Sequence, residues 1–288
     1  MPPERTATEA AELLPFLIAN WPEVKRTRLK QWLKFGSVRV NGKAATRHDH
    51  GLKPGDKITI KVERAPSKKA APLPAGLEIV HEDDAIIILN KGPGWLTVAL
   101  DSGNGRTAYA ALMDHVRAQN PRNRIWIVHR LDRDTSGLIL FAKTEPFKRM
   151  LQQNWQKFEK RYLAVAEGVI KRDAGTLRCH VNEEFSLRVR SVPPDEGTRE
   201  AVSHFKVLKR TADRTLVEMK IDTGRRHQIR VHLSDMGHPI VGDAPYGAKT
   251  DPAKRLGLHS SQLIFTHPAT EEKMKFDLPL PSVLAKLV

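Results

Sequence analysis

The stretch IVHRLDRDTSGLIL, residues 127–140, decides how this sequence is interpreted. Apolar runs at both ends of it predict two strands, and Thr135, Ser136 and Gly137 predict a turn between them. Five ionisable side chains fall within six positions of the connection: His129, Arg130, Asp132, Arg133 and Asp134. Such a connection is either a solvated turn held by ion pairs or an active-site loop presented by two strands.

Composition limits the classes of protein to consider. The chain has 288 residues, 40% of them hydrophobic, which is enough for one large domain with a small one beside it. Aromatic residues make up 6%, which argues against an aromatic stacking platform. We expect no membrane span and no secretory signal, because no long apolar run occurs. The single cysteine, Cys179, excludes an internal disulfide and favours a cytoplasmic protein.

Charge points to a polyanionic partner. Lys and Arg outnumber Asp and Glu by 48 to 33, which gives a formal net charge of +15. Nucleic acid is the commonest partner of such a protein, and a basic surface kept for solubility is the alternative. Residues 1–70 hold 15 Lys and Arg against 7 Asp and Glu, so more than half of the excess lies in the first quarter of the chain. This asymmetry predicts a separate basic module.

The N-terminal part has the pattern of a small RNA-binding domain. Residues 65–76 are rich in Pro and Ala and predict a linker between domains at residues 1–64 and 77–288. Two helices followed by short strands are predicted in the first domain. The segments RLKQWLKFGSVRVNGK and LKPGDKITI resemble the RNA-binding domain first described in ribosomal small-subunit protein four. We expect RNA contacts from the basic face of its second helix, with a merely solvated face as the alternative: Lys25, Arg26, Arg28, Lys30 and Lys34.

The larger part predicts an α+β fold. Strand patterns dominate residues 77–288, and helices interrupt them at irregular intervals. Because strands and helices do not alternate regularly, we expect a mixed, mainly antiparallel sheet with helices packed on it.

Three motifs suggest other kinds of chemistry, but each lacks a feature that the chemistry needs. The segment GDAPYGAKT, residues 242–250, nearly forms a phosphate-binding loop, but Ala248 interrupts the Gly-Lys-Thr sequence that such a loop needs. The segment RHDH, residues 47–50, offers too few ligands, so we expect no metal site. A hydrolase triad within one loop would lack the usual nucleophile elbow: Ser136, His129 and Asp132.

Four segments together indicate a family. In order they are HRLDRDTSGLILFAKT, KRYLAVAEG, DTGRRHQIRVHLSDMGHPIVGDAPYG and LHSSQLIFTHP. They resemble the RluA-type pseudouridine synthases across residues 77–288. The resemblance implies isomerisation of uridine in RNA: the bond from the ribose anomeric carbon to the base nitrogen breaks, the base turns, and it rejoins through carbon five. It implies no cofactor and no metal.

The resemblance also implies roles for single residues. Asp132 matches the catalytic aspartate, which adds to the anomeric carbon or assists an elimination there. Arg230 matches the arginine that pairs with this carboxylate and keeps it ionised. Tyr162 matches an active-site tyrosine that stacks on uracil, although a strand tyrosine is more often a core residue. Ile229 is expected to form an apolar wall for the base.

RNA contacts follow from the same match. The target base must leave its stack, and Arg130 matches the residue that enters the vacated space. Lys91, Arg225 and Arg226 are expected to hold phosphates. The loop reads NKGPGW where the family commonly reads NKPAG, which affects local RNA contacts rather than chemistry.

The substrate stays open at this point. We expect a monomer acting on large-subunit ribosomal RNA, with transfer RNA as the alternative. A non-catalytic ribosome-assembly factor and an RNA hydrolase are the competing classes. The set of Asp132, Tyr162 and Arg230 argues against the first, and the missing metal site and nucleophile elbow argue against the second. Arg133 and Asp134 have no assigned role, and an ordinary ion pair is expected for them.

Overall fold

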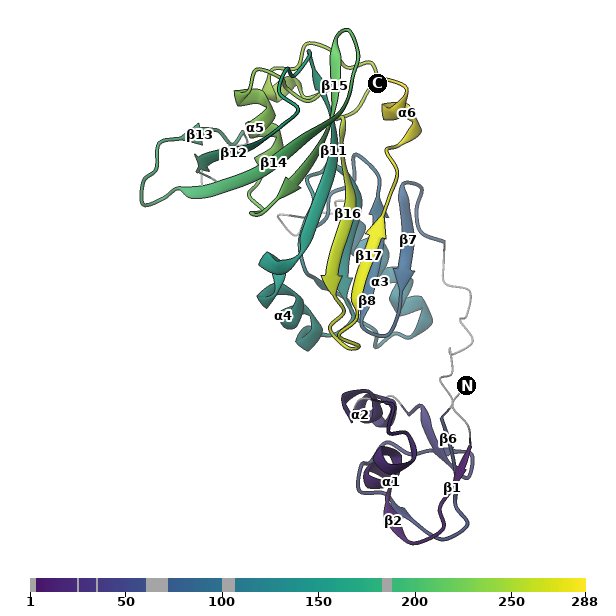
Figure 1. Cartoon of the computed structure of the whole chain (residues 1–288). Helices are drawn as coiled ribbons and strands as arrows, with labels where there is room; N and C mark the ends of the chain where they lie inside the picture. The colour runs from purple at the N-terminus through teal and green to yellow at the C-terminus, as the bar shows by residue number, and fades with distance from the viewer. Residues whose placement is uncertain (1–3, 25, 35, 61–71, 100–106, 183–187) are drawn as a thin grey trace. The chain divides into compact units, whose positions relative to one another are not determined.

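The structure, a computed structural model, describes residues 4–24, 26–34, 36–60, 72–99, 107–182 and 188–288. The chain divides into two compact units, Met1–Lys69 and Ala70–Val288 (Figure 1). Most of the expected linker, residues 65–76, lies outside the described residues. Each unit has its own hydrophobic core and is described by itself.

The first unit combines two short helices with short antiparallel strands. Its elements are β1 (Arg5–Thr6), β2 (Ala11–Glu12), α1 (Leu13–Asn20), α2 (Arg26–Lys34), β3 (Val38–Val40), β4 (Lys43–Ala44), β5 (Gly51–Leu52) and β6 (Lys57–Ile60). Leu17 of α1 and Leu29 of α2 are buried in one core. Asn41 and Gly42 both have positive φ, as a two-residue turn between β3 and β4 requires.

The second unit is built on one sheet of eleven strands. Nine of them follow the order β13-β12-β14-β15-β11-β16-β10-β8-β7, while β17 pairs with β16 and β9 with β10. Their bounds are β7 (Leu77–Glu82), β8 (Ile86–Lys91), β9 (Trp126–Ile127), β10 (Ser136–Ala142), β11 (Glu159–Glu167), β12 (Ala174–Val181), β13 (Ser191–Val192), β14 (Arg199–Arg210), β15 (Arg214–Ile221), β16 (Leu258–Thr266) and β17 (Lys273–Asp277). Only the β10–β16 pair is parallel among these described strands, so the predicted mixed, mainly antiparallel α+β fold is confirmed.

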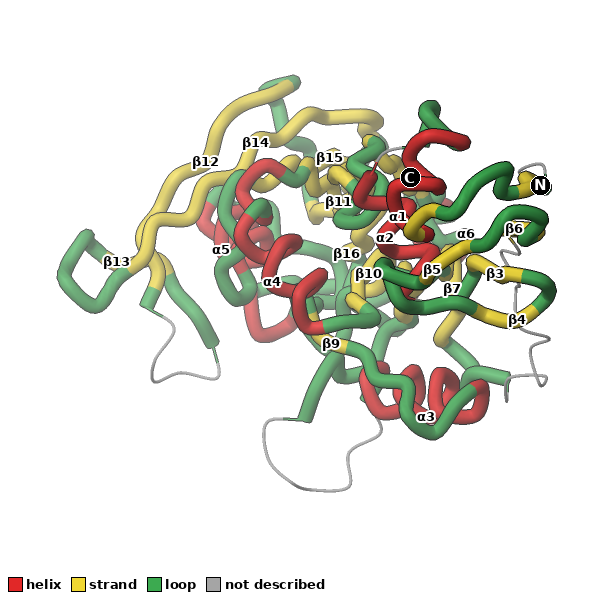
Figure 2. The backbone as a smooth tube through the Cα atoms, turned by 90° about the horizontal axis from the view of Figure 1, so that it is seen from below, coloured by secondary structure: helices red, strands yellow, loops and turns green. Residues whose placement is uncertain are grey.

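Helices cover both faces of this sheet (Figure 2). They are α3 (Ala108–Gln119), α4 (Glu145–Gln153), α5 (Gln228–Asp235) and α6 (Ser282–Ala285), with short 3-10 helices η1 (Trp155–Lys157) and η2 (Ala244–Tyr246). Side chains alternate along β8, so Ile87 packs in the core of α3 while Ile88 packs in the core of α4. Helix α5 packs against β12 and β14 at the other end of the sheet.

Two features of strand pairing shape the region between the two ends of the sheet. Tyr162 on β11 packs against the core of α3 and also against the core of α5. The register between β11 and β16 shifts immediately before Tyr162, and such an irregularity re-aims the side chain that follows it. Gly137 has a φ of 111° where β10 meets β16, and a Cβ there would collide with the backbone of Ser260.

Candidate active site

A cavity of about 290 Å³ opens beside the loop between β9 and β10. Its walls come from that loop, from β11 and β15, and from the segment that leads into α5. Six residues predicted from the sequence line it: Arg130, Asp132, Tyr162, Arg225, Ile229 and Arg230. Segments almost a hundred residues apart in sequence therefore meet around one space, near the lower end of the roughly 300–1,000 Å³ typical of ligand pockets.

Buried polar groups fix the loop that carries Asp132. Thr97 Oγ1 donates to the Leu131 carbonyl at 2.8 Å and accepts from the Leu131 amide at 3.1 Å. His129 Nε2 accepts from the Leu140 amide at 3.1 Å, and burial lowers the pKa of His129 to about 3. The imidazole is therefore a neutral support of the loop. The triad considered for hydrolysis does not form, because the Ser136 hydroxyl contacts His259 instead of His129.

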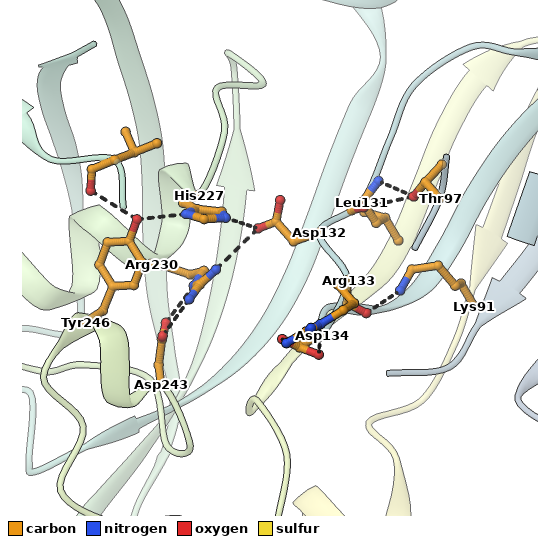
Figure 3. A network of polar contacts seen from close by, with 11 residues as sticks. Lys91, Thr97, Leu131, Asp132, Arg133, Asp134, His227, Arg230, Asp243 and Tyr246 are labelled. Carbon is orange, nitrogen blue, oxygen red and sulfur yellow. Dashed lines mark hydrogen bonds and ion pairs between the residues drawn. The ribbon is translucent and has the colours of Figure 1, made fainter. Parts of the chain in front are cut away.

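Lys91 requires a correction. It was expected on an RNA-binding surface, but its side chain is 0% exposed. Its ammonium donates to the carbonyls of Gly92 and Trp95 at 3.1 and 2.9 Å. It also donates to the Arg133 carbonyl at 3.0 Å (Figure 3). Burial lowers the pKa of Lys91 to about 8, while Asp134 and Asp132 oppose the shift. Lys91 thus joins β8 to the loop and is not available to a phosphate.

The Asp132 carboxylate faces two cation-capable side chains without a hydrogen bond to either. Its Oδ2 lies 3.9 Å from Arg230 Nη1 and 3.9 Å from His227 Nε2 (Figure 3). The side chain is 20% exposed, at the wall of the cavity. Burial raises the pKa of Asp132, and the positive charges of Arg230 and Arg130 oppose this rise. The oxygen atoms remain open to a group that enters the cavity.

Arg230 is held by a different acid from the one expected. Its Nε and Nη2 donate to the two carboxylate oxygens of Asp243, both at 2.7 Å. Asp243 is 1% exposed, and the Tyr246 ring lies 4.5 Å from the guanidinium carbon. This two-pronged contact fixes the plane of the guanidinium, so Nη1 is aimed at Asp132 before any substrate binds. Arg230 therefore has two carboxylate neighbours, of which Asp243 is the nearer and Asp132 the more distant.

His227 completes this side of the cavity. It adopts a left-handed backbone conformation, with φ 56°, directly before α5. Its Nδ1 lies 2.8 Å from the Tyr246 hydroxyl, which donates to the Val189 carbonyl at 3.0 Å. Burial, together with the charges of Arg230 and Arg226, lowers the pKa of His227 to about 4, so the ring is neutral near pH 7.

Tyr162 and Ile229 give the cavity an apolar part of its lining. Burial and the nearby charge of Asp132 raise the pKa of Tyr162, so its hydroxyl keeps its proton at neutral pH. Ile229 is buried in the α5 core and also lines the cavity. Thr135 lines the same space, and its hydroxyl is buried without a hydrogen-bond partner among the described residues. A buried donor of this kind needs a partner, which a polar ligand can supply.

The basic residues predicted to contact RNA are distributed between the two units. Arg130 is exposed at the cavity wall, and Arg225 lines the cavity while its Nε donates to the Glu200 carbonyl. Arg226 is partly buried in the same segment. In the first unit, Arg26, Arg28 and Lys30 are exposed on α2. Lys25 lies outside the described residues, and only the backbone of Lys34 is described.

Arg133 and Asp134, which had no assigned role, form an exposed ion pair at 3.1 Å with each other. The residues that sequence reasoning missed are His227, Asp243 and Tyr246. Asp243 and Tyr246 belong to the segment set aside as an imperfect phosphate loop. An acid and a tyrosine enclosed by glycines in GDAPYG were a signal, but no local pattern shows that they reach Arg230.

Other kinds of site find no support in the described part of the chain. No group of three or more His, Cys, Asp or Glu side chains is placed to hold a metal ion there. No described helix is long and apolar enough to cross a membrane.

Comparisons with solved structures identify the fold. The human protein named RNA pseudouridylate synthase domain containing 1 superimposes with a TM-score of 0.58 and 25% identity, over 73% of this chain and 86% of the other. The human domain containing 4 protein gives a TM-score of 0.60 at 24% identity, over 72% of this chain and 90% of the other. The second unit therefore has the fold of these synthases.

Sequence comparisons carry the assignment further. The family described as RNA pseudouridylate synthase matches residues 85–235. An uncharacterized RNA pseudouridine synthase of Bacillus subtilis, YlyB, is 35% identical over 279 residues, or 95% of this chain and 91% of that protein. Ribosomal large subunit pseudouridine synthase D of Neisseria meningitidis serogroup A is 36% identical over 285 residues, or 93% of this chain and 75% of that protein. This chain belongs to the RNA pseudouridylate synthase family and is an RNA pseudouridine synthase, an isomerase.

Proposed function

We propose that this enzyme converts uridines of large-subunit ribosomal RNA to pseudouridine, with Asp132 as the group that acts at the ribose anomeric carbon. The observation that carries the proposal is the position of Asp132. Its carboxylate lies in a cavity between an anchored guanidinium and a partly apolar wall, and its Oδ2 is hydrogen-bonded to no described residue. Such a carboxylate can meet a reacting carbon without first breaking a contact of its own.

The charges around Asp132 suit this role. Burial alone favours the protonated acid, which can neither add to a carbon nor remove a proton. Arg230 opposes that tendency at 3.9 Å and is itself neutralised by Asp243 at 2.7 Å. The carboxylate is therefore stabilised without being locked into a close ion pair. Both the addition route and the elimination route need this ionised form.

The remaining walls fit a flipped uridine. Tyr162 and Ile229 offer a ring and an aliphatic side chain for the faces of uracil. The Tyr162 hydroxyl retains its proton and can exchange it with a base atom during isomerisation. Arg130 is exposed at the cavity wall, and we expect it to fill the gap that the uridine leaves in its stack.

The choice of RNA rests on the relatives and on the first unit. Several relatives carry the name ribosomal large subunit pseudouridine synthase D. In the first unit, α2 presents basic side chains at exposed positions. We assign this unit an RNA-binding role, with the helix surface contacting phosphates of a structured RNA.

The test is tritium release from RNA labelled at carbon five of uridine. We expect release from large-subunit ribosomal RNA by the wild-type enzyme and less than a thousandth of that rate with Asp132→Asn. The variant should be at least as stable, because an aspartate with a raised pKa in the folded state costs stability above its unfolded pKa. Substantial turnover by Asp132→Asn would refute its role. Release only from transfer RNA would refute the choice of substrate, and mapping pseudouridines in cells with and without the gene would locate the uridine.

A further inference from the structure

A short chain of hydrogen bonds fixes the proton position of His227. The Val189 carbonyl can only accept, so the Tyr246 hydroxyl donates its one proton there, at 3.0 Å. The Tyr246 oxygen must then accept from His227 Nδ1, which lies 2.8 Å away. In the neutral ring the other nitrogen, Nε2, consequently carries a lone pair and no proton.

That lone pair points at the reaction centre. Nε2 lies 3.9 Å from Oδ2 of Asp132, and both residues line the cavity (Figure 3). An ionised carboxylate has no proton to donate, so two acceptors face each other across the gap. Among the described residues none donates to His227 Nε2. The arrangement favours a ligand that brings a hydrogen-bond donor next to the atom on which Asp132 acts.

An internal uridine of RNA has only two such donors. Its 3′ and 5′ oxygens are in phosphodiesters, which leaves N3–H of the base and the 2′-hydroxyl of the ribose. N3 lies on the edge of uracil away from the glycosidic bond. The 2′-hydroxyl is attached to the carbon next to the anomeric carbon, on the ring face opposite the base. A carboxylate that adds to the anomeric carbon opposite the departing base approaches on that same face.

We propose that His227 Nε2 accepts a hydrogen bond from the 2′-hydroxyl of the target uridine and so holds the ribose against Asp132. The inference rests on the proposed action of Asp132 at the anomeric carbon and deepens it. His227 is then a substrate-contacting residue that distinguishes ribose from 2′-deoxyribose at the reacting nucleotide. Tyr246 is a positioning residue for His227, because its hydroxyl fixes the imidazole proton on Nδ1.

The left-handed backbone at His227 offers a suitable variant. Asparagine tolerates this conformation, keeps a polar group near the Tyr246 hydroxyl and cannot extend an acceptor to the place of Nε2. His227→Asn therefore removes the proposed contact with little backbone strain. Tyr246→Phe is the second variant, since it leaves the imidazole in place and removes the group that selects its tautomer.

The experiment is a cycle of two enzymes and two substrates. Two synthetic RNAs are compared. In one the target uridine has ribose, in the other it has 2′-deoxyribose at that nucleotide alone, and kcat/KM is measured for each. We expect wild type to lose about tenfold on the 2′-deoxy substrate, the usual effect of one neutral hydrogen bond. His227→Asn should lose about tenfold on the ribose substrate and little more on the 2′-deoxy substrate. Changes in sugar pucker cancel, because both enzymes meet the same two RNAs.

The outcomes separate this inference from the proposed function. Equal ribose to 2′-deoxyribose ratios in wild type and His227→Asn would overturn the contact while leaving the role of Asp132 intact. Absence of wild-type turnover on the ribose substrate would overturn the proposed function itself. Should His227→Asn fail to fold, Tyr246→Phe decides: a ratio reduced from the wild-type value supports the contact, and an unchanged ratio contradicts it.

Discussion

At the scale of single residues, the site depends on which polar groups already have partners. Thr135 and Thr215 are both buried threonines with opposite hydrogen-bonding states. Thr135 is among the residues that line the cavity, and its hydroxyl is buried without a partner among the described residues. The Thr215 hydroxyl donates to the Gly168 carbonyl at 2.8 Å and accepts from the Ile170 amide at 3.0 Å. The same substitution should therefore have opposite effects at the two positions.

Replacing Thr135 by valine should lower kcat/KM about tenfold and leave stability unchanged or slightly higher. The valine fills the same space, and no hydrogen bond to a described residue is lost, whereas the contact that we expect this hydroxyl to make with the uridine is removed. Thr215→Val should instead lose about 1–3 kcal/mol in the free energy of unfolding with kcat/KM unchanged, because a buried carbonyl and amide lose their partner. Urea unfolding and tritium release measure both. A stability loss at Thr135 without an activity loss would exclude a substrate contact.

Arg230 should set the acid limit of activity. Arg230 is the leading cation that opposes the rise in the pKa of Asp132. Arg230→Gln should raise that pKa further, so the carboxylate protonates at a higher pH and the acid limb of kcat/KM moves upward. Arg230→Lys keeps the charge and should shift less. Carbon-13 NMR titration of labelled aspartate carboxyls reads the pKa even in inactive variants. An unmoved Asp132 titration in Arg230→Gln would show that the cation does not control it.

At the scale of elements, Lys91 connects β8 to the catalytic loop. Lys91→Met should cost about 1–3 kcal/mol of unfolding free energy, because the carbonyls of Gly92, Trp95 and Arg133 lose their shared donor. Activity should fall as well, since the Arg133 contact lies one residue from Asp132. Lys209→Met, at an exposed position of β14, is the matched control and should change neither quantity. Equal stability of both variants would contradict the role given to Lys91.

The same elements show what the sequence could and could not predict. Strand alternation, the turn at Asn41 and the helix start at Thr107 depend on neighbours within a few residues, and local patterns reveal them. The Arg230–Asp243 contact joins α5 to a turn that follows it, and the parallel β10–β16 pair joins residues more than a hundred positions apart. Lys91 was expected at the surface because its three acceptors are backbone carbonyls. Every residue has such a carbonyl, so no sequence pattern shows which of them a lysine will contact.

At the scale of the whole molecule, removing positive charge from the first unit should weaken RNA binding without slowing the chemical step. The chain carries a formal net charge of +15, and α2 presents Arg26, Arg28 and Lys30 at exposed positions. Replacing all three by glutamine in the full chain should weaken RNA binding and make the plot of log Kd against log salt concentration shallower by about 2, because each lost phosphate contact removes roughly 0.7. Single-turnover rates at saturating enzyme should stay near wild type.

A control with the same charge change distinguishes a binding surface from a general field. Lys171, Lys206 and Lys209 are exposed on the second unit and away from the cavity lining, so their joint change to glutamine removes three charges without touching α2. For this variant we expect a smaller change in the slope of log Kd against log salt concentration. Only counterions that direct phosphate contacts displace contribute to that slope. Equal losses for the two triple variants would mean that α2 acts through net charge alone, and the RNA-binding role of the first unit would have to be given up.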